Sequence, residues 1–361
     1  MSTKSLNIAT RRLIAQQLSG TSIRNAAEMV SWFGAVQGQE YVQTKWGLGL
    51  RLAGHTDQTI EKELSDAKIL RTHLLRPTWH FVNAEDIRWI LGLSAASVQA
   101  VNAYMYKKLE LDFTLFRKTN QIMEKILNKN GEMTREEIND EFRKSKIFAE
   151  GHRLSYVMMQ AELEGIICSG AKRGNQFTYS LLSNRVAKGK SLPNDLALAE
   201  LTKRYFQSRG PATLKDFSTW SGLSIKDCKK GVEMIRSSLE KMASEDGDCY
   251  FFREINSERD FSGLIHLLPI YDEYIMGYKD RTAIFEYKNR LKEASPIRHD
   301  CMIIYEGQII GSWKRTIGKK QIDLYYDLYK PISNKQKKAF EGAIALFGDF
   351  NGLTINLKKT G

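Results

Sequence analysis

Two segments of the chain repeat one plan, and this repeat is the strongest constraint on the fold. Residues 130–142 read NGEMTREEINDEF, and residues 209–220 read RGPATLKDFSTW. In both, Gly-x-x-Thr separates two helical patterns, and an acidic residue follows the threonine three positions later. At that spacing the hydroxyl of Thr134 or Thr213 caps a helix, and the acid returns the hydrogen bond. Each threonine therefore predicts the start of a helix.

A third helical pattern and a hairpin follow in both segments. Helix, helix, helix, hairpin is the element order of a winged helix, and tandem copies of one unit form a repeat architecture. A looser copy opens the chain, with KILRTHLLRPTWHFV as its hairpin. The other expected elements are helices at 6–18, 24–34, 154–164, 195–208, from Thr213 and at 224–240, and strands in GIICSGAKRGNQFTYSLL and around SEDGDCYFFR.

From about Gly263 onward the pattern changes to short strands, with one helix expected at 334–347. The strand patterns are LIHLLPI, CMIIYEGQIIGSW with Glu306-Gly307 as its turn, QIDLYYDLY and LTINLK. We therefore predict a mainly α with β (α+β) fold, in which three tandem winged-helix units precede a small, separate β-rich unit. The predicted domains are 1–112, 113–190, 191–260 and 261–361, with a linker at 183–195.

The chain carries a large excess of positive charge. Its 361 residues include 54 Lys and Arg against 42 Asp and Glu, a net charge of +12, and its pI is near 9.3. Residues 310–361 alone hold ten basic and four acidic residues, a net +6. This balance favours a polyanionic partner such as nucleic acid.

Several classes of protein are disfavoured. None of the four cysteines forms a C-x-x-C pair, which argues against a disulfide framework and a zinc site. GLGLRLAG at 47–54 lacks the dinucleotide-binding spacing, and there is no P-loop or H-E-x-x-H motif. No apolar run is long enough for export or membrane spanning. We expect a cytoplasmic monomer that uses no metal, cofactor or membrane.

Two neutral amides flank a glycine in GAVQGQEY, residues 34–41. Side chains two apart on a helix point to different sides, so Gln37 and Gln39 share a target only if the backbone is extended or turning. Gly38 permits that break. Amides at a helix end also hydrogen-bond to water or to free backbone groups, and the pair alone is compatible with that ordinary role.

Several phrases together resemble the winged-helix DNA glycosylases of the AlkZ/YcaQ-like family, which unhook interstrand crosslinks. They are RPTWHFV at Arg76, GPATLKDFSTWSGL at Gly210, LLPIYDEYIMGYKDR at Leu267 and GQIIGSWKR at Gly307. The resemblance implies three tandem winged helices around a basic channel, and a Gln-apolar-Gln motif near the N-terminus. Gln37 and Gln39 stand where that motif falls, and Gly38 takes the place of its apolar residue.

The resemblance implies a monofunctional DNA glycosylase that hydrolyses the N-glycosidic bond of N7-alkylated guanine in duplex DNA, including crosslinked guanine. Gln37 and Gln39 would be its catalytic residues. N7 alkylation makes the base a good leaving group, so catalysis needs no strong acid or base. An amide can then supply what is needed, because its carbonyl orients the water and its dipole favours positive charge on the sugar. EYKNR at 286–290 has no Schiff-base signature, so no lyase step is expected. Because Gly38 has no side chain, we expect an apolar residue there to leave activity unchanged or to raise it, provided that the backbone at this position does not need positive φ.

Basic residues in the hairpins are the candidate DNA contacts, although a surface or structural role explains each of them as well. The candidates are Arg76 and His80, with His73, in the first hairpin, Lys172 and Arg173 at the tip of the second, and Lys314 and Arg315 after the C-terminal turn. Asp272 or Asp280 could offer a carboxylate to the sugar cation, but we favour a turn or a buried pair with Arg281 or Lys279.

Two other functions remain open. The main alternative is a non-enzymatic winged-helix DNA-binding protein or regulator, because tandem winged helices need only basic residues and a recognition helix. Gly38 in the glutamine motif favours this alternative. The weaker one is an RNA-binding protein, which should display clustered aromatic side chains for stacking on unpaired bases. No such cluster clearly departs from the core pattern in the sequence.

Overall fold

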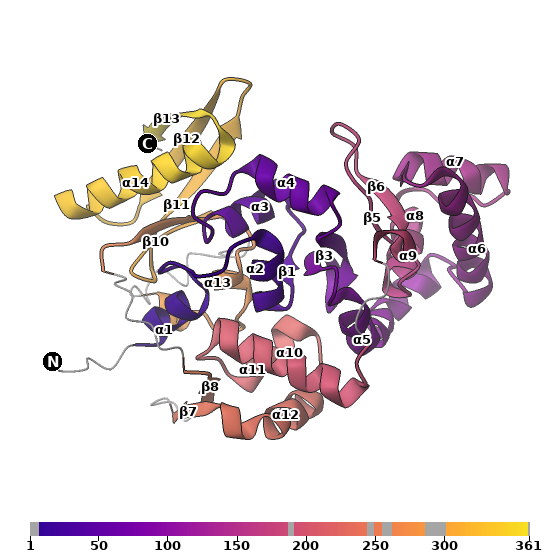
Figure 1. Ribbon diagram of the computed structural model, residues 1–361, viewed down its shortest axis with the longest axis horizontal. Coiled ribbons are helices and arrows are strands. Elements are labelled where there is room, and N and C mark those ends of the chain that lie inside the picture. Colours follow the sequence, from indigo (N-terminus) through magenta and orange to yellow (C-terminus); the bar gives the residue numbers. More distant parts are fainter. Residues whose placement is uncertain (1–6, 187–190, 244–248, 255–261, 286–300, 360–361) are drawn as a thin grey trace.

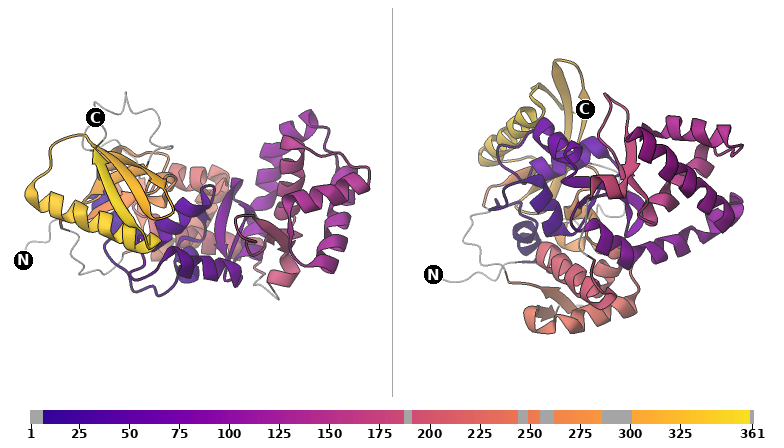
Figure 2. Two further views of the ribbon diagram at one scale, coloured as in Figure 1. Left: turned by 90° about the horizontal axis from the view of Figure 1, so that it is seen from above. Right: turned by 45° about the vertical axis from the view of Figure 1, so that its right-hand side comes forward.

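The computed structural model describes residues 7–186, 191–243, 249–254, 262–285 and 301–359 (Figure 1). It is a mixed α+β structure with several small sheets and one five-stranded sheet. Figure 2 shows an elongated molecule, with the five-stranded sheet at one end and α6 to α8 at the other. Part of the expected linker, 187–190, and the segment 286–290 lie outside the described residues.

The N-terminal part holds a small sheet surrounded by helices. Its strands lie in the order β1-β3-β2, and β2 and β3 are the predicted first hairpin. A long helix, α5, closes this part and was not predicted. The elements are α1 (Ile8–Ala15), α2 (Ala26–Phe33), β1 (Val36–Gln37), α3 (Tyr41–Gly49), α4 (Asp57–Ser65), β2 (Ile69–Leu74), β3 (Arg76–Asn83) and α5 (Ile87–Lys108).

The next part has the predicted order of three helices and a hairpin, and a hydrophobic core of its own. Thr134 accepts a hydrogen bond from the backbone of Glu137, whose side chain returns one, so the predicted capping box is confirmed. The elements are α6 (Phe113–Asn130), β4 (Met133–Thr134), α7 (Arg135–Lys144), α8 (Gly151–Leu163), β5 (Ile167–Ser169), β6 (Thr178–Leu181) and α9 (Leu182–Arg185).

A third part begins with α10, which packs against α2, α5 and α12. Its capping box between Thr213 and Asp216 is also confirmed. The helix expected to run to residue 240 ends earlier, at Met234, where a 3-10 turn leads into a strand. The elements are α10 (Asn194–Arg209), α11 (Leu214–Ser221), α12 (Ile225–Met234), η1 (Arg236–Ser238), β7 (Glu240–Ala243) and β8 (Cys249–Phe252).

The C-terminal part is the five-stranded sheet, in the order β13-β12-β11-β10-β9, with α14 packed against β9 and β13. The turn at Glu306-Gly307 joins β10 and β11 as predicted. Only β13 runs parallel to its neighbour. The elements are β9 (Ile265–Leu268), α13 (Glu273–Met276), η2 (Thr282–Ile284), β10 (Cys301–Tyr305), β11 (Gln308–Ile317), β12 (Gln321–Leu328), α14 (Asn334–Asn351) and β13 (Thr354–Lys359).

The C-terminal sheet, which the sequence predicts to be a separate unit, shares its hydrophobic core with the N-terminal part. One continuous hydrophobic core joins it to the helices before residue 81. Trp46 of α3 packs edge-on against Phe347 and Phe350 of α14, and its indole N–H donates to the carbonyl of Leu267 at 2.7 Å. A Cβ at Gly49 would lie 2.2 Å from the ring of Phe350. This glycine of the GLGLRLAG stretch therefore allows α3 and α14 to approach closely.

Candidate active site

Gln37 and Gln39 lie at the edge of the β1-β3-β2 sheet. Gln37 is the last residue of β1 and lies directly opposite His80 of β3. Gln39 follows in a bend just before α3. The extended and turning backbone that the sequence analysis required is therefore present.

Gly38 brings the backbone of this turn into direct contact with β3. Its N–H donates to the carbonyl of Trp79 at 2.7 Å. An added Cβ would lie 2.9 Å from Cδ1 of Phe81, whose ring is completely buried. The turn is thus fixed by close backbone packing. The effect of an apolar side chain at position 38 on activity stays a prediction, and the crowding against Phe81 favours a loss over the expected gain.

Gly38→Ala should destabilise the protein by about 1–3 kcal/mol, the usual cost of overpacking a dense site. The methyl group must displace either Phe81 or the turn between the two glutamines, so base release should also slow. Urea unfolding and a single-turnover excision assay measure the two effects. An unchanged unfolding midpoint would contradict the contact with Phe81.

The backbone on the other side of Gln37 is held by a buried ion pair. The Gln37 N–H donates to Oε1 of Glu273 at 2.9 Å. Arg209 pairs with the same carboxylate at 2.6 Å, and the two side chains are 0% and 2% exposed. Arg209 also donates to the carbonyls of Phe33 and Ala35, at 2.8 and 3.0 Å. Residues 33–37 are therefore clamped by side chains from α10 and α13.

The side chain of Gln37 is held by β3. Oε1 of Gln37 accepts a hydrogen bond from Nη2 of Arg76 at 3.0 Å, and the same nitrogen lies 3.4 Å from Nε2 of His80. Alternate residues of a strand share a face, which places Arg76 and His80 together opposite Gln37. His80 is completely buried, so it lies behind Arg76 and is not exposed to solvent.

Arg71 of β2 holds the turn at Gln39. It donates to the carbonyls of Gly38 at 2.9 Å and Gln39 at 3.3 Å. Its guanidinium lies 4.3 Å from the ring centre of Trp79 and 4.9 Å from that of Phe177. Gln39 itself is half-buried, and within the described part of the chain its amide makes no hydrogen bond. The Gln39 side chain is therefore available to a substrate.

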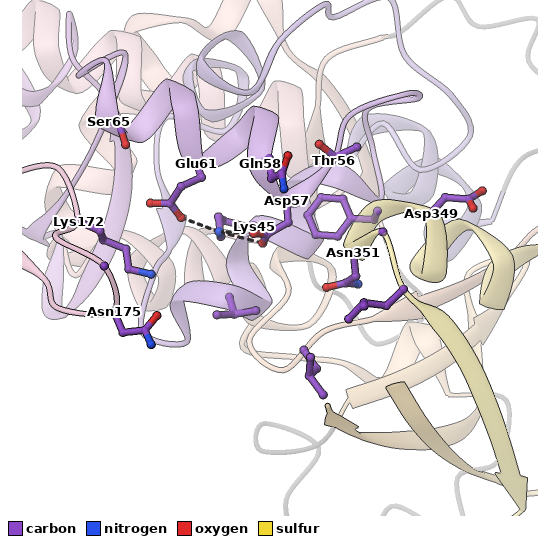
Figure 3. A pocket seen from close by; sticks show the side chains of 16 residues that line it. Lys45, Thr56, Asp57, Gln58, Glu61, Ser65, Lys172, Asn175, Asp349 and Asn351 are labelled. Carbon is purple, nitrogen blue, oxygen red and sulfur yellow. Dashed lines mark hydrogen bonds and ion pairs between the residues drawn. The ribbon is translucent and has the colours of Figure 1, made fainter. Parts of the chain in front are cut away.

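A groove of about 890 Å³ opens over α3, the helix that follows this turn, and its lining begins at Val42 and includes neither glutamine. It is bordered by α3, α4, the turn between β5 and β6, the end of β11 and the end of α14 (Figure 3). In Figure 1 the β5–β6 and β11–β12 turns rise on the same side, with α4 between them. On its floor, the ammonium of Lys45 lies 2.9 Å from Asp57 and 2.6 Å from Glu61. The positive charge of Lys45 is therefore offset by two carboxylates.

The predicted basic residues occupy different places around this groove. Lys172 lines it, with its ammonium 5.4 Å from the ring centre of Tyr41. Arg173 is exposed and pairs with Glu137 at 2.7 Å. Lys314 is exposed on β11 and Arg315 is half-buried.

His73 of the first hairpin is buried beside Glu162. The assignment of DNA contacts to Arg76, His80, Lys172, Arg173, Lys314 and Arg315 stays a prediction, and only Lys172 borders the groove.

The two candidate aspartates have structural partners. Asp272 forms a buried, two-pronged pair with Arg51, with both distances 2.8 Å. Asp280 accepts hydrogen bonds from the backbone and hydroxyl of Thr282. Asp272 therefore belongs to a buried pair and Asp280 to a turn, as the sequence analysis favoured. The partner of Asp272 is Arg51, however, and not Arg281 or Lys279.

Three residues that support the glutamines were not singled out from the sequence: Arg71, Arg209 and Glu273. Glu273 stands next to Asp272, and Arg209 opens the second repeated segment. The signal that could have found them is an ionisable residue inside an otherwise apolar pattern, because a buried charge requires a partner.

The described residues contain no helix that is long and apolar enough to cross a membrane. Within the same ranges, no three His, Cys, Asp or Glu side chains are grouped as a metal ion would require.

Comparison with known proteins identifies relatives over nearly the whole chain. The family model described as DNA glycosylase AlkZ-like matches residues 30–350. An interstrand DNA cross-link repair glycosylase of Streptomyces sahachiroi is 22% identical over 351 residues, covering 91% of this chain and 92% of that protein. The solved structure of Streptomyces sahachiroi DNA glycosylase AlkZ superposes with a TM-score of 0.79 at 19% identity, covering 98% of each chain. These matches confirm the predicted resemblance.

Proposed function

The chain belongs to the AlkZ-like DNA glycosylase family, and we propose that it releases N7-alkylated guanine from duplex DNA, including guanine held in an interstrand crosslink. The observation that carries the proposal is the turn at Gln37 and Gln39. It is fixed from three sides, by Arg209 with Glu273, by Arg76 and by Arg71. Preorganised polar groups of this kind accelerate a reaction because they need no rearrangement in the transition state.

The chemistry is hydrolysis of the bond between C1′ of the sugar and N9 of the base. The electron pair of that bond goes to the departing base and neutralises the positive charge of its alkylated ring. The oxygen of a water molecule bonds to C1′, and the water loses one proton to solvent. The products are the free alkylated base and an abasic sugar. Between them, Gln37 and Gln39 orient the water and stabilise the charges that develop as the bond breaks.

An open site suits a crosslinked base. Most base-cleaving enzymes extrude their target into a pocket, whereas a base tied to the opposite strand cannot leave the duplex freely. Gln39 is half-buried in a bend, and an open groove begins at Val42 of the helix that follows. We propose that the duplex lies along this face of three proposed winged-helix units, with Lys172 at its side.

Excision from defined duplexes tests the function. One duplex carries a single N7-methylguanine, and a second carries an N7-guanine interstrand crosslink. After incubation, alkali should cleave the first at its abasic site, and the strands of the second should separate on a denaturing gel. Tight binding to both duplexes without release of any base would instead support the non-enzymatic DNA-binding protein.

Salt dependence of binding separates the same two functions in another way. The net charge of +12 should give affinity for duplex DNA with little sequence preference. That affinity should fall about 10³-fold or more between roughly 50 and 200 mM salt if about six phosphates are contacted. Fluorescence anisotropy with two unrelated duplexes measures it. Tight binding to one sequence with little affinity for the other would favour a regulator.

A further inference from the structure

Arg76 determines which end of the Gln37 amide faces inward. An arginine side chain carries only hydrogen-bond donors, so the amide atom 3.0 Å from Nη2 must be the oxygen, Oε1. The same contact with the amide reversed would bring two donors together. The orientation of this amide is therefore set by chemistry and not by an arbitrary choice between oxygen and nitrogen.

His80 supports this arrangement from behind. Nδ1 of His80 lies 2.9 Å from the carbonyl of Thr78, so Nδ1 carries the proton and donates it there. Burial, followed by the nearby charge of Arg76, holds the pKa of His80 well below its usual range, so the ring is neutral. Nε2 therefore offers a lone pair to Arg76 and does not repel it. Arg76 is held between two acceptors, His80 and Gln37.

The other polar groups of Gln37 are also engaged. Its N–H donates to Glu273 at 2.9 Å, and its backbone carbonyl accepts from the hydroxyl of Thr44 at 3.0 Å. The side-chain nitrogen of Gln37, Nε2, is the one polar group of this residue without such a partner among the described residues. It has no hydrogen bond to any residue that the structure describes, and it is not among the polar atoms sealed from solvent without a partner.

We propose that Arg76 is a positioning residue that turns Oε1 of Gln37 inward, so that Gln37 serves the substrate as a hydrogen-bond donor while Gln39 supplies the acceptor carbonyl. This inference rests on the proposed function and divides it between the two glutamines. As the bond from C1′ to N9 breaks, its electrons pass to the base, so acceptor atoms of guanine attract a donor more strongly in the transition state. The water that attacks C1′ hydrogen-bonds to the free carbonyl of Gln39.

Glutamate substitutions separate the two roles, because glutamate keeps the oxygens of glutamine and loses the NH₂ group. Gln37→Glu retains an acceptor for Arg76 and should slow single-turnover release of N7-methylguanine by about 10²-fold. Gln39→Glu retains its acceptor and should stay within about tenfold of the parent. Equal losses for the two variants, or a larger loss for Gln39→Glu, would overturn the division of roles.

Substitutions of Arg76 test its part. Arg76→Met should slow release by about tenfold through lost orientation. Because Arg76 is engaged by Gln37 and His80, the DNA dissociation constant should stay within about twofold, in contrast to what a direct DNA contact of Arg76 would give. Arg76→Lys keeps a donor and should restore part of the rate. Combining Arg76→Met with Gln37→Glu should be no slower than Gln37→Glu alone, because both remove one interaction. Arg143→Met, on exposed α7, is the matched control. A fully additive double variant, or a loss confined to DNA affinity, would contradict the positioning role.

A spectroscopic measurement judges the inference even if the parent releases no base. In protein labelled with ¹⁵N-glutamine, the Gln37 side-chain NH₂ signals are assigned by their loss in Gln37→Ala. They should move toward solvent-exposed values in Arg76→Met and stay close to parent values in Arg76→Lys. Identical signals in the parent and Arg76→Met would show that Arg76 does not orient the amide. Absence of excision by the parent would count against the proposed function alone.

Discussion

Replacing Gln37 or Gln39 by alanine should slow the release of N7-methylguanine by about 10²-fold, the scale seen when one preorganised polar group is lost. Both residues are uncharged, so the dissociation constant for duplex DNA should change little. Saturating enzyme and single-turnover conditions measure the chemical step without binding or product release. Gln43→Ala, on the neighbouring helix α3, is a matched glutamine control and should retain the parent rate.

The fold should survive both substitutions. The turn is fixed by backbone contacts of Gly38 with Trp79 and Arg71, and these do not involve the amide groups. Thermal unfolding of each variant should therefore stay close to that of the parent. Parent-like excision by either variant would remove that glutamine from the mechanism.

Arg209→Met should destabilise the protein by about 3–5 kcal/mol, because it leaves the Glu273 carboxylate buried without its cation. The remaining donors to Glu273 are the indole of Trp220 at 3.1 Å and the backbone of Gln37 at 2.9 Å, which do not replace a full charge. The carbonyls of Phe33 and Ala35 lose their donor as well. The loop before Gln37 should loosen, so any folded variant should also release base slowly.

Urea unfolding followed by circular dichroism measures this loss. Arg236→Met is the matched control, since its pair with Glu233 is exposed, at 63% and 64%, and should contribute at most about 1 kcal/mol. A loss for Arg209→Met as small as that of the control would mean that water reaches Glu273 in place of the arginine.

Local signals in the sequence predicted much of the architecture. A cap such as Thr134 or Thr213 acts within three residues, so its partner can be read from spacing alone. The hairpin turn at Glu306-Gly307 is likewise local. Both capping boxes and this turn are present. The placement of α12 was correct at its start, where Ser224 caps it, and wrong at its end, where no local stop signal had been found.

Long-range pairings could not be read in the same way. Arg209 and Glu273 are 64 residues apart, and Arg76 and Gln37 are 39 apart, so only the fold brings them together. The role of Gly38 depends on a ring from another strand, Phe81. The shared core of the C-terminal sheet depends on α3 packing against α14. The candidate glutamines could therefore be chosen from the sequence, and their catalytic role stays a prediction, whereas the residues that hold them could be found only in the structure.

The most direct test compares the parent with the Gln37→Ala, Gln39→Ala double variant on one duplex that carries a single N7-methylguanine. The free base is identified and timed by mass spectrometry, and binding to the same duplex is measured by anisotropy. The account predicts that the parent releases 7-methylguanine, and that the double variant binds equally well but releases it at least about 10²-fold more slowly. Release at the parent rate by the double variant, or DNA binding by the parent without any released base, would contradict it.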